Sequence, residues 1–152
     1  HKGYLPYTSN NILRSAFKYY GSPYGWGGMH KSVDCSSLVA NAYRTVGIFL
    51  PRNADEQELT AGAAQKLTGK TSAQRMEIVK GLMPGACLYM DGHTVMYVGT
   101  SNDVPYVIHS LATHYTGGVR NTEMRVVVSD LALQRASGNS FLDEFNTAMT
   151  FK

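Results

Sequence analysis

The period of the hydrophobic pattern changes once along the chain, and this change constrains the fold most. Apolar residues recur with helical spacing at residues 10–20 and again at 35–46. After a turn at residues 83–85 the pattern predicts strands at residues 86–90, 94–99, 106–110 and 124–129. Helices that precede an antiparallel meander predict an α+β fold, with the helices packed on one side of the sheet.

The stretch between these two halves has weaker patterns. Short helices are predicted at residues 54–63 and 72–80, with a surface loop at residues 65–71. Neither an internal repeat nor a linker interrupts the 152 residues. The chain is therefore predicted to form a single domain, residues 1–152, with one core. Residues beyond 110 are expected to complete the sheet.

Composition argues against several classes of protein. Hydrophobic residues make up 43% of the chain and charged residues 16%, a mixture that does not suit disorder. The net charge of +3 is scattered over single lysines and arginines, which disfavours a nucleic-acid partner. No run of about 18 apolar residues occurs, so no membrane span is predicted. No signal peptide is recognised within the chain, which leaves the localisation open.

Two cysteines occur, Cys35 and Cys87, and their surroundings differ. They are too few for a disulfide scaffold, and no CxxC pair suggests structural zinc. Cys35 follows Asp34, a good N-cap, and so opens the second predicted helix. Free N–H groups and the partial positive charge of a helix start stabilise a thiolate, so Cys35 is predicted to be unusually acidic. Burial as a small apolar residue is the alternative for Cys35, and is the expectation for Cys87.

A catalytic thiolate needs a base, and the base needs an orienting group. His93 stands at the start of one predicted strand, and His109 stands near the end of the next. Antiparallel neighbours place these two positions at the same end of a sheet. One histidine can then act as the base while the other holds its tautomer. A metal site built from Cys35, His93, His109 and His30 is the rival interpretation, which the helix-start cysteine disfavours.

Six motifs, in this order, resemble those of the NlpC/P60 family of cell-wall cysteine peptidases. They are YGWGG at 24–28, DCSSLV at 34–39, GIFLPR at 47–52, LMPGA at 82–86, GHTVMYVG at 92–99 and YVIHS at 106–110. The resemblance runs from residue 11 to about residue 110, roughly two thirds of the chain. No single motif is decisive, whereas six in the family's order are a specific signal.

The resemblance implies a papain-like α+β fold and a set of roles. Cys35 would be the nucleophile, His93 the general base and His109 the orienting residue. The implied reaction is hydrolysis of a peptidoglycan stem peptide through a thioester on Cys35, usually between γ-D-glutamate and the following diamino acid. The Cys35 N–H would stabilise the oxyanion. No metal or other cofactor is implied, and the diamino acid, diaminopimelate or lysine, remains open.

The resemblance also implies substrate-binding residues. In a subgroup of the family, Tyr24, Asp34 and Ser36 match the positions that bind the free α-amine of the stem peptide. A carboxylate suits an ammonium, although capping the helix is the alternative role of Asp34. Trp26 is expected beside the site. Ser37 stands where the family commonly has glycine and is expected to narrow the groove near the helix start.

The start of the chain resembles the leader from an upstream domain. This resemblance covers residues 1–9 and implies SH3-like wall-binding domains before a monomeric catalytic domain. Peptidoglycan or its released stem peptides would be the partner. The localisation would then be extracytoplasmic, with cytoplasmic peptide recycling as the alternative.

Arg52 is expected to have a structural role, in which its side chain holds the turn at residues 50–51.

Two other functions remain open beside the peptidase. One is a papain-like acyltransferase or thioesterase that acts on lipid. Such an enzyme would need an apolar channel or a membrane-active segment, and the sequence predicts no amphipathic basic helix of that kind. The other is a wall-binding module without catalysis. The intact set of Cys35, His93 and His109 argues against this second alternative.

Overall fold

The computed structural model describes residues 3–25, 33–60 and 62–151. The helices in these ranges are α1 (Ser9–Phe17), α2 (Cys35–Arg44), α3 (Ala54–Glu58), α4 (Ser72–Lys80) and α5 (Phe141–Glu144). The strands are β1 (Ala63–Lys66), β2 (Cys87–Met90), β3 (His93–Ser101), β4 (Val104–Thr116), β5 (Val119–Ser129) and β6 (Thr147–Thr150). The strands form a six-stranded sheet with the order β1-β6-β2-β3-β4-β5, and each neighbouring pair is antiparallel.

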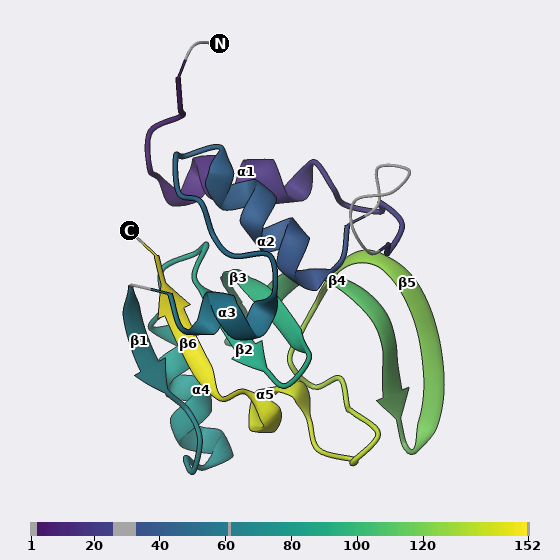
Figure 1. The fold of residues 1–152 in the computed structure, drawn as a ribbon. Helices are drawn as coiled ribbons and strands as arrows, with labels where there is room; N and C mark the ends of the chain where they lie inside the picture. Colours follow the sequence, from purple (N-terminus) through teal and green to yellow (C-terminus); the bar gives the residue numbers. More distant parts are fainter. Residues whose placement is uncertain (1–2, 26–32, 61, 152) are drawn as a thin grey trace.

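Helices cover both faces of this sheet. Figure 1 shows α1 and α2 across the top of the sheet, with α4 and α5 below it. The expected α+β fold is confirmed, but the helices are divided between two layers rather than gathered on one side. The second layer comes from segments that follow α3 and β5, where the hydrophobic pattern is weak.

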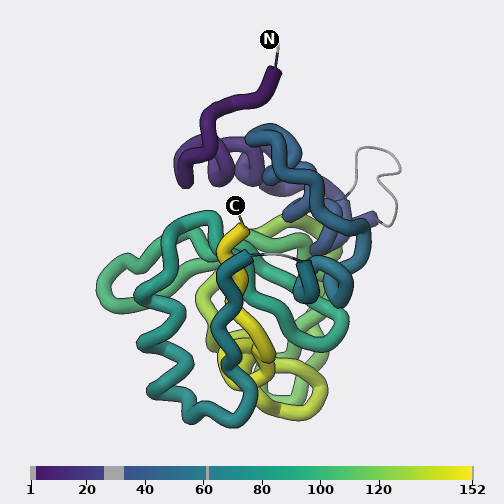
Figure 2. Tube along the Cα trace, turned by 60° about the vertical axis from the view of Figure 1, so that its left-hand side comes forward, coloured from purple at the N-terminus to yellow at the C-terminus, as the bar shows by residue number. Residues whose placement is uncertain are grey.

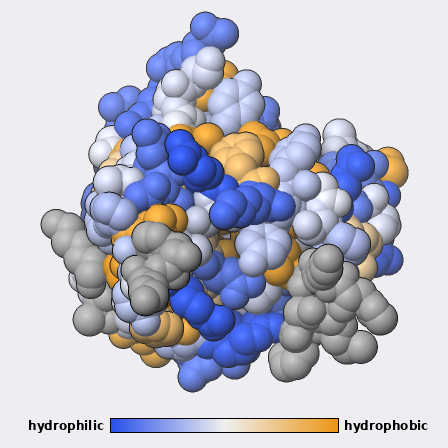
Figure 3. All heavy atoms as spheres, turned by 90° about the horizontal axis from the view of Figure 1, so that it is seen from above, coloured by the Kyte–Doolittle hydropathy of each residue, from blue (hydrophilic) through white to orange (hydrophobic). Residues whose placement is uncertain are grey.

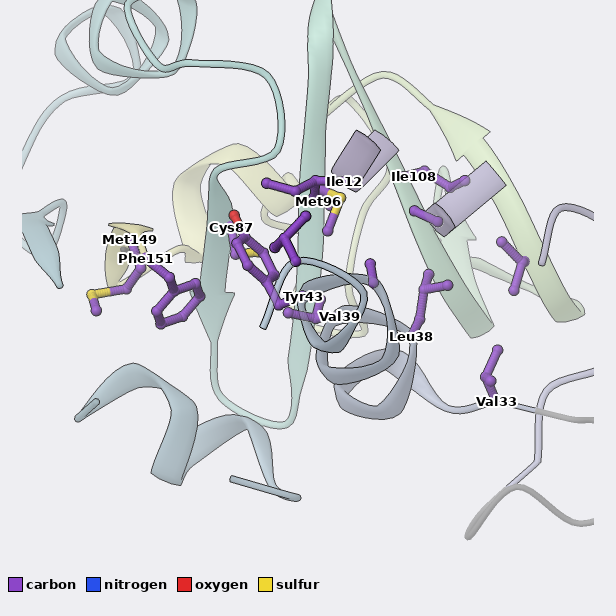
Figure 4. Close-up of a cluster of buried hydrophobic side chains, with 14 of the residues drawn as sticks. Ile12, Val33, Leu38, Val39, Tyr43, Cys87, Met96, Ile108, Met149 and Phe151 are labelled. Atoms are coloured by element: carbon purple, nitrogen blue, oxygen red, sulfur yellow. The ribbon is translucent and has the colours of Figure 1, made fainter. Parts of the chain in front are cut away.

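Strand alternation fills both layers with apolar side chains. On β2, Cys87 and Tyr89 belong to the core beneath α1 and α2, while Leu88 and Met90 belong to the core beside α4 and α5. The first of these cores is shown in Figure 4 and includes Ile12, Leu38, Val39, Tyr43, Met96, Ile108 and Phe151. Burial of each large apolar side chain contributes roughly 1.5–3 kcal/mol. This core fixes α2, and therefore Cys35, against the centre of the sheet.

The segment between α3 and α4 differs from the expectation. A helix over residues 54–63 and a loop over 65–71 were expected, whereas α3 ends at Glu58 and β1 occupies residues 63–66. All four residues of β1 are exposed, so no alternation marks the strand in the sequence. Its backbone partners lie on β6, where Ala63 pairs with Thr150. The prediction was wrong because a partner far along the chain supplies these hydrogen bonds.

Strand β6 completes the sheet, as expected for the C-terminal part of the chain. It lies between β1 and β2 rather than at the rim. Figure 2 shows this yellow segment running through the middle of the molecule, beside the segment that carries β1. The order along the chain is therefore a meander only from β2 to β5.

The ribbon of β4 and β5 is longer than expected and holds the segment before α2. The two strands curve together away from the rest of the sheet (Figure 1) and are joined by a tight turn at Gly117 and Gly118, both with positive φ. The Tyr24 N–H donates to the Met124 carbonyl of β5 at 2.8 Å. This contact fixes Tyr24 close to the start of α2.

The face seen from above carries interleaved hydrophilic and hydrophobic residues (Figure 3). Two exposed aromatic residues, Tyr4 and Phe49, pack edge to face with ring centroids 5.8 Å apart. Within the described ranges, no helix is both long and apolar enough to cross a membrane.

Candidate active site

The start of α2 is held by a reciprocal cap around Cys35. The Asp34 carboxylate accepts a hydrogen bond from the Ser37 N–H at 2.9 Å, and the Ser37 hydroxyl accepts one from the Asp34 N–H at 2.9 Å. The predicted N-cap role of Asp34 is confirmed. Ser37 thus directs its hydroxyl to the cap, and it is not among the residues that line the cleft described below.

Burial changes the acidity expected for Cys35. The residue is only 8% exposed, and this desolvation raises the pKa of its thiol above the ordinary value. Hydrogen bonds from the N–H groups of Thr94 and Ser36 and from its own N–H lower this pKa but do not offset the burial, and the Asp34 charge raises it further. The prediction of an acidic Cys35 was therefore wrong, because burial of the thiol outweighs the hydrogen bonds from the helix-start donors. The resting thiol is protonated at neutral pH.

Cys87 behaves as expected for a buried cysteine. It has no exposed surface, and burial raises the pKa of its thiol strongly. It lies in the core beneath α1 and α2 rather than in the cleft.

The two strand-end histidines meet as the hairpin geometry predicts. His93 Nε2 and His109 Nδ1 are 2.8 Å apart, and both residues are buried. The strands that carry them are neighbours in the sheet. Phe141 of α5 packs against both rings, with centroid distances of 5.7 Å and 6.1 Å. The expectation that β3 and β4 bring these two side chains together is confirmed.

A chain of hydrogen bonds continues from His109 to the end of β5. His109 Nε2 lies 2.8 Å from Ser129 Oγ, and the Ser129 hydroxyl donates to the Asp130 carbonyl at 3.0 Å. A carbonyl only accepts, so the single hydroxyl proton of Ser129 is used there. Ser129 Oγ must then accept from His109 Nε2–H.

This direction sets the tautomers of both histidines. With its proton on Nε2, His109 accepts at Nδ1, so His93 must donate from its Nε2–H. The lone pair of His93 is then left on Nδ1. The chain from Ser129 to His93 therefore presents a basic nitrogen at the opposite side of the His93 ring.

Burial keeps both rings neutral. Desolvation first, and then the charge of the nearby Arg135 guanidinium, together lower the pKa of His93 to about 4. The pKa of His109 is also held well below its ordinary value, first by burial and then by the neighbouring histidines. Among the described residues, His93 is hydrogen-bonded to His109, and the next residue, Thr94, donates its N–H to the Cys35 sulfur. In structures without substrate, the hydrogen bonds between catalytic groups are often long, and they shorten when substrate binds.

Arg52 binds two residues at the start of α2, which the sequence did not predict. Its guanidinium forms an ion pair with Asp34 Oδ2 at 2.6 Å and donates to Ser36 Oγ at 3.0 Å. Burial by itself would raise the pKa of Asp34, but Arg52 and the capping bonds of Ser37 hold it below the ordinary value. The residue expected to clamp the turn at 50–51 thus joins that turn to the start of α2.

The site opens into a cleft with two compartments. Cys35 and its neighbours Asp34 and Ser36 line a compartment of about 520 Å³. His93 lines the other, of about 300 Å³. Tyr24 lines both, and burial raises the pKa of its phenol, so it stays protonated at neutral pH.

Two of the residues named from the sequence cannot be placed. Trp26 and His30 lie outside the described residues. In the ranges that are described, no group of three histidine, cysteine or acidic residues is arranged to hold a metal ion.

Three contributors to the site were not predicted from the sequence. Ser129 and Arg135 come from the end of β5 and the loop after it, far along the chain from Cys35. Gln57 of α3 is fully buried and donates to the Ser36 carbonyl at 3.0 Å. The predicted strand at residues 124–129 already included Ser129, and only its register was missing. In the observed register His109 pairs with Val127, which places Ser129 diagonally from His109.

A helix-start cysteine packed on an antiparallel sheet that carries two buried histidines defines a papain-like α+β domain. The model of the NlpC/P60 family matches residues 21–127, and the chain belongs to this family. The matched range includes Cys35, His93 and His109.

Two curated bacterial proteins resemble the chain over part of their length. The bifunctional muramidase/DL-endopeptidase CwlT of Bacillus subtilis is 36% identical over 91 residues, which are 58% of this chain and 26% of that protein. Dipeptidyl-peptidase 6 of Lysinibacillus sphaericus is 30% identical over 90 residues, or 59% of this chain and 29% of that protein. The matches thus span less than a third of these relatives.

A solved structure has the same fold over nearly the whole chain. It is an NlpC/P60 endopeptidase from Photobacterium damselae subsp. piscicida, with a TM-score of 0.73 and 22% sequence identity. The similarity covers 91% of this chain and 38% of that one. At this identity the likeness concerns the fold.

Proposed function

We propose that the chain is a cysteine endopeptidase that cleaves peptidoglycan stem peptides at the bond between γ-D-glutamate and the following diamino acid. The observation that carries the proposal is the chain from Ser129 through His109 to His93, which leaves His93 Nδ1 as a base beside the helix that begins at Cys35. Membership of the NlpC/P60 family and the DL-endopeptidase name of one relative support the same reaction.

The first half of the reaction forms a thioester. His93 Nδ1 takes the proton of the neutral Cys35 thiol, and the sulfur attacks the γ-carbonyl carbon of D-glutamate. The Cys35 N–H at the start of α2 stabilises the oxyanion. The carbon–nitrogen bond then breaks as the His93 imidazolium gives its proton to the departing amine. His109 stabilises the imidazolium by accepting from Nε2–H.

The second half of the reaction releases the acyl group. Water gives a proton to His93 Nδ1 and its oxygen attacks the thioester carbon. The carbon–sulfur bond breaks, and the sulfur regains the proton from His93. The products are a carboxylic acid and the free thiol, so the enzyme returns to its resting state.

The Cys35 compartment suits the amine end of the stem peptide. Its lining includes Asp55 and Glu58 of α3, beside Tyr24, Asp34 and Ser36. We propose, as the family resemblance suggests, that the last three residues bind the free α-amine. The Asp34 carboxylate is shared with Arg52, so the two acids of α3 add the negative charge that an ammonium needs.

The test is hydrolysis of two synthetic stem peptides by the wild type and by Cys35→Ala. One peptide has a free L-Ala amine before γ-D-Glu–diamino acid, and in the other this amine is acetylated. We expect the wild type to cleave the free peptide and Cys35→Ala to lose cleavage by about 10⁴-fold or more. Cys87→Ala is the matched control, because it removes the other thiol and leaves the cleft intact.

Each other outcome discards a different part of the proposal. Equal cleavage of both peptides would support the peptidase activity and contradict the proposed binding of the free amine. Cleavage by the Cys35→Ala variant would contradict a mechanism through a thioester on Cys35. A wild type that cleaves neither peptide would favour acyl transfer or wall binding, and a binding assay with purified peptidoglycan would separate these two. As a wall hydrolase, the protein would act outside the cytoplasmic membrane.

A further inference from the structure

The two compartments of the cleft carry opposite charge. Four acids and one arginine among the described residues line the Cys35 compartment: Asp34, Asp55, Glu58, Asp91 and Arg52. Among the described residues that line the His93 compartment, Arg135 alone carries a full charge, because His93 is neutral at pH 7. A substrate that spans both compartments therefore meets negative charge on one side and positive charge on the other.

Within the described ranges, the Arg135 guanidinium forms one side-chain hydrogen bond. Its Nη1 donates to the Asp91 carbonyl at 2.7 Å, in the turn between β2 and β3. A guanidinium has five N–H donors in a planar fork that matches a carboxylate. In the part of the chain that the structure describes, no carboxylate oxygen lies within 4.0 Å of this group. Arg135 thus lines the compartment of about 300 Å³ and has no acidic partner among the described residues.

The proposed mechanism assigns the two compartments to opposite ends of the substrate. The departing amine takes its proton from His93, so the residue that carries this amine must lie in the compartment that His93 lines. The acyl part stays on Cys35 and therefore occupies the compartment lined by Cys35. This assignment rests on the proposed function.

We infer that Arg135 binds a free carboxylate of the diamino acid on the leaving side of the scissile bond. Such a pair is charge-assisted and can be bidentate, which gives both affinity and orientation. Two sources offer this group. The side chain of diaminopimelate carries a carboxylate whatever follows it in the stem, whereas lysine offers one only where it ends the peptide. Arg135 then makes the enzyme prefer stems of the first kind or stems with a free C-terminus.

The test measures binding without turnover, in the Cys35→Ala background. The probes are meso-diaminopimelyl-D-alanine amide, whose one carboxylate is on the side chain, lysine, whose one carboxylate is terminal, and lysyl-D-alanine amide, which has none. NMR titration gives each Kd. We expect at least one carboxylate probe to bind about tenfold tighter than lysyl-D-alanine amide, and the probe that does so identifies the source.

The variants show whether Arg135 is responsible. Adding Arg135→Gln is expected to abolish the tenfold difference, and Arg135→Lys to retain part of it. Arg44→Gln is the matched control, since it removes the same charge from an exposed position at the other end of α2. Equal binding of all three probes to Cys35→Ala, or a difference that survives in Arg135→Gln, would overturn the inference.

Hydrolysis by the protein with Cys35 intact separates this inference from the proposed function. Cleavage of stem peptides without a carboxylate preference would support the endopeptidase activity and contradict the role of Arg135. Carboxylate-dependent binding without cleavage of any stem peptide would support the role of Arg135 and contradict the endopeptidase activity.

Discussion

At the scale of single residues, the position of a proton on His93 depends on two residues that do not line the cleft, His109 and Ser129. Ser129 directs its own proton to the Asp130 carbonyl, and this choice passes through His109 to His93. Without that hydroxyl, His109 could carry its proton on Nδ1 and would then no longer accept from His93. A single hydroxyl at the end of β5 therefore decides which nitrogen of His93 is basic.

Removing this hydroxyl is expected to slow the reaction without weakening substrate binding. For Ser129→Ala we expect kcat to fall by about tenfold, the loss of one hydrogen bond, with KM nearly unchanged. Ser129→Thr keeps the hydroxyl and should retain most of kcat. Steady-state kinetics and nitrogen NMR of the imidazoles measure the two effects. A wild-type kcat in Ser129→Ala, with the His109 tautomer unchanged, would show that Ser129 has no positioning role.

At the scale of elements, the short helix α3 ties the start of α2 to the sheet. Gln57 of α3 is fully buried, and its Nε2 donates to the carbonyls of Ser36 and Pro51 at 3.0 Å and 2.9 Å. Its Oε1 accepts from the Tyr89 hydroxyl of β2 at 3.0 Å. One amide thus joins α2, the turn before α3 and a central strand.

Replacing this amide by an apolar group should destabilise the domain. Gln57→Leu leaves two carbonyls and the Tyr89 hydroxyl without this partner, and we expect the free energy of unfolding to fall by about 2–4 kcal/mol. Gln65→Leu on the exposed strand β1 is the control and should change it by less than about 0.5 kcal/mol. Urea unfolding measures both. Equal stability of the two variants would mean that the buried amide contributes nothing.

At the scale of the whole molecule, burying two neutral histidines makes the fold sensitive to acid. The pKa of His93 is about 4 in the folded protein, against 6.5 for a free side chain. As the pH falls through 6.5 the unfolded chain takes up a proton that the folded protein does not, so stability is lost until about pH 4. The lowered pKa of His109 acts in the same direction.

This linkage predicts the pH dependence of stability. We expect His93 to account for a loss of about 3 kcal/mol between pH 6.5 and pH 4. His93→Gln should therefore show a flatter decline than the wild type over this range. The lowered pKa of Asp34 also makes stability fall toward low pH, but it acts alike in both proteins and cancels in the comparison. Denaturant unfolding at several pH values gives both curves, and identical slopes would contradict a buried neutral His93.

The fold and much of the site were predictable because their signals are local. The hydrophobic pattern has a helical period at residues 35–46 and a strand period at residues 94–99, and Asp34 is a typical N-cap that marks the start of the helix. Two neighbouring strands were enough to bring His93 and His109 to one end of the sheet. The strand at residues 63–66 was missed, since an exposed edge strand depends on its distant partner.

The sequence by itself determined the α+β class, the order of the motifs, and the pairing of two histidines near a helix-start cysteine. Only the tertiary structure decided that Cys35 is a neutral thiol, that Ser129 sets the histidine tautomers and that Arg135 faces the cleft. The physical reason is the range of each effect. Helical and strand patterns depend on neighbours along the chain, whereas desolvation and side-chain contacts depend on segments that only packing brings together.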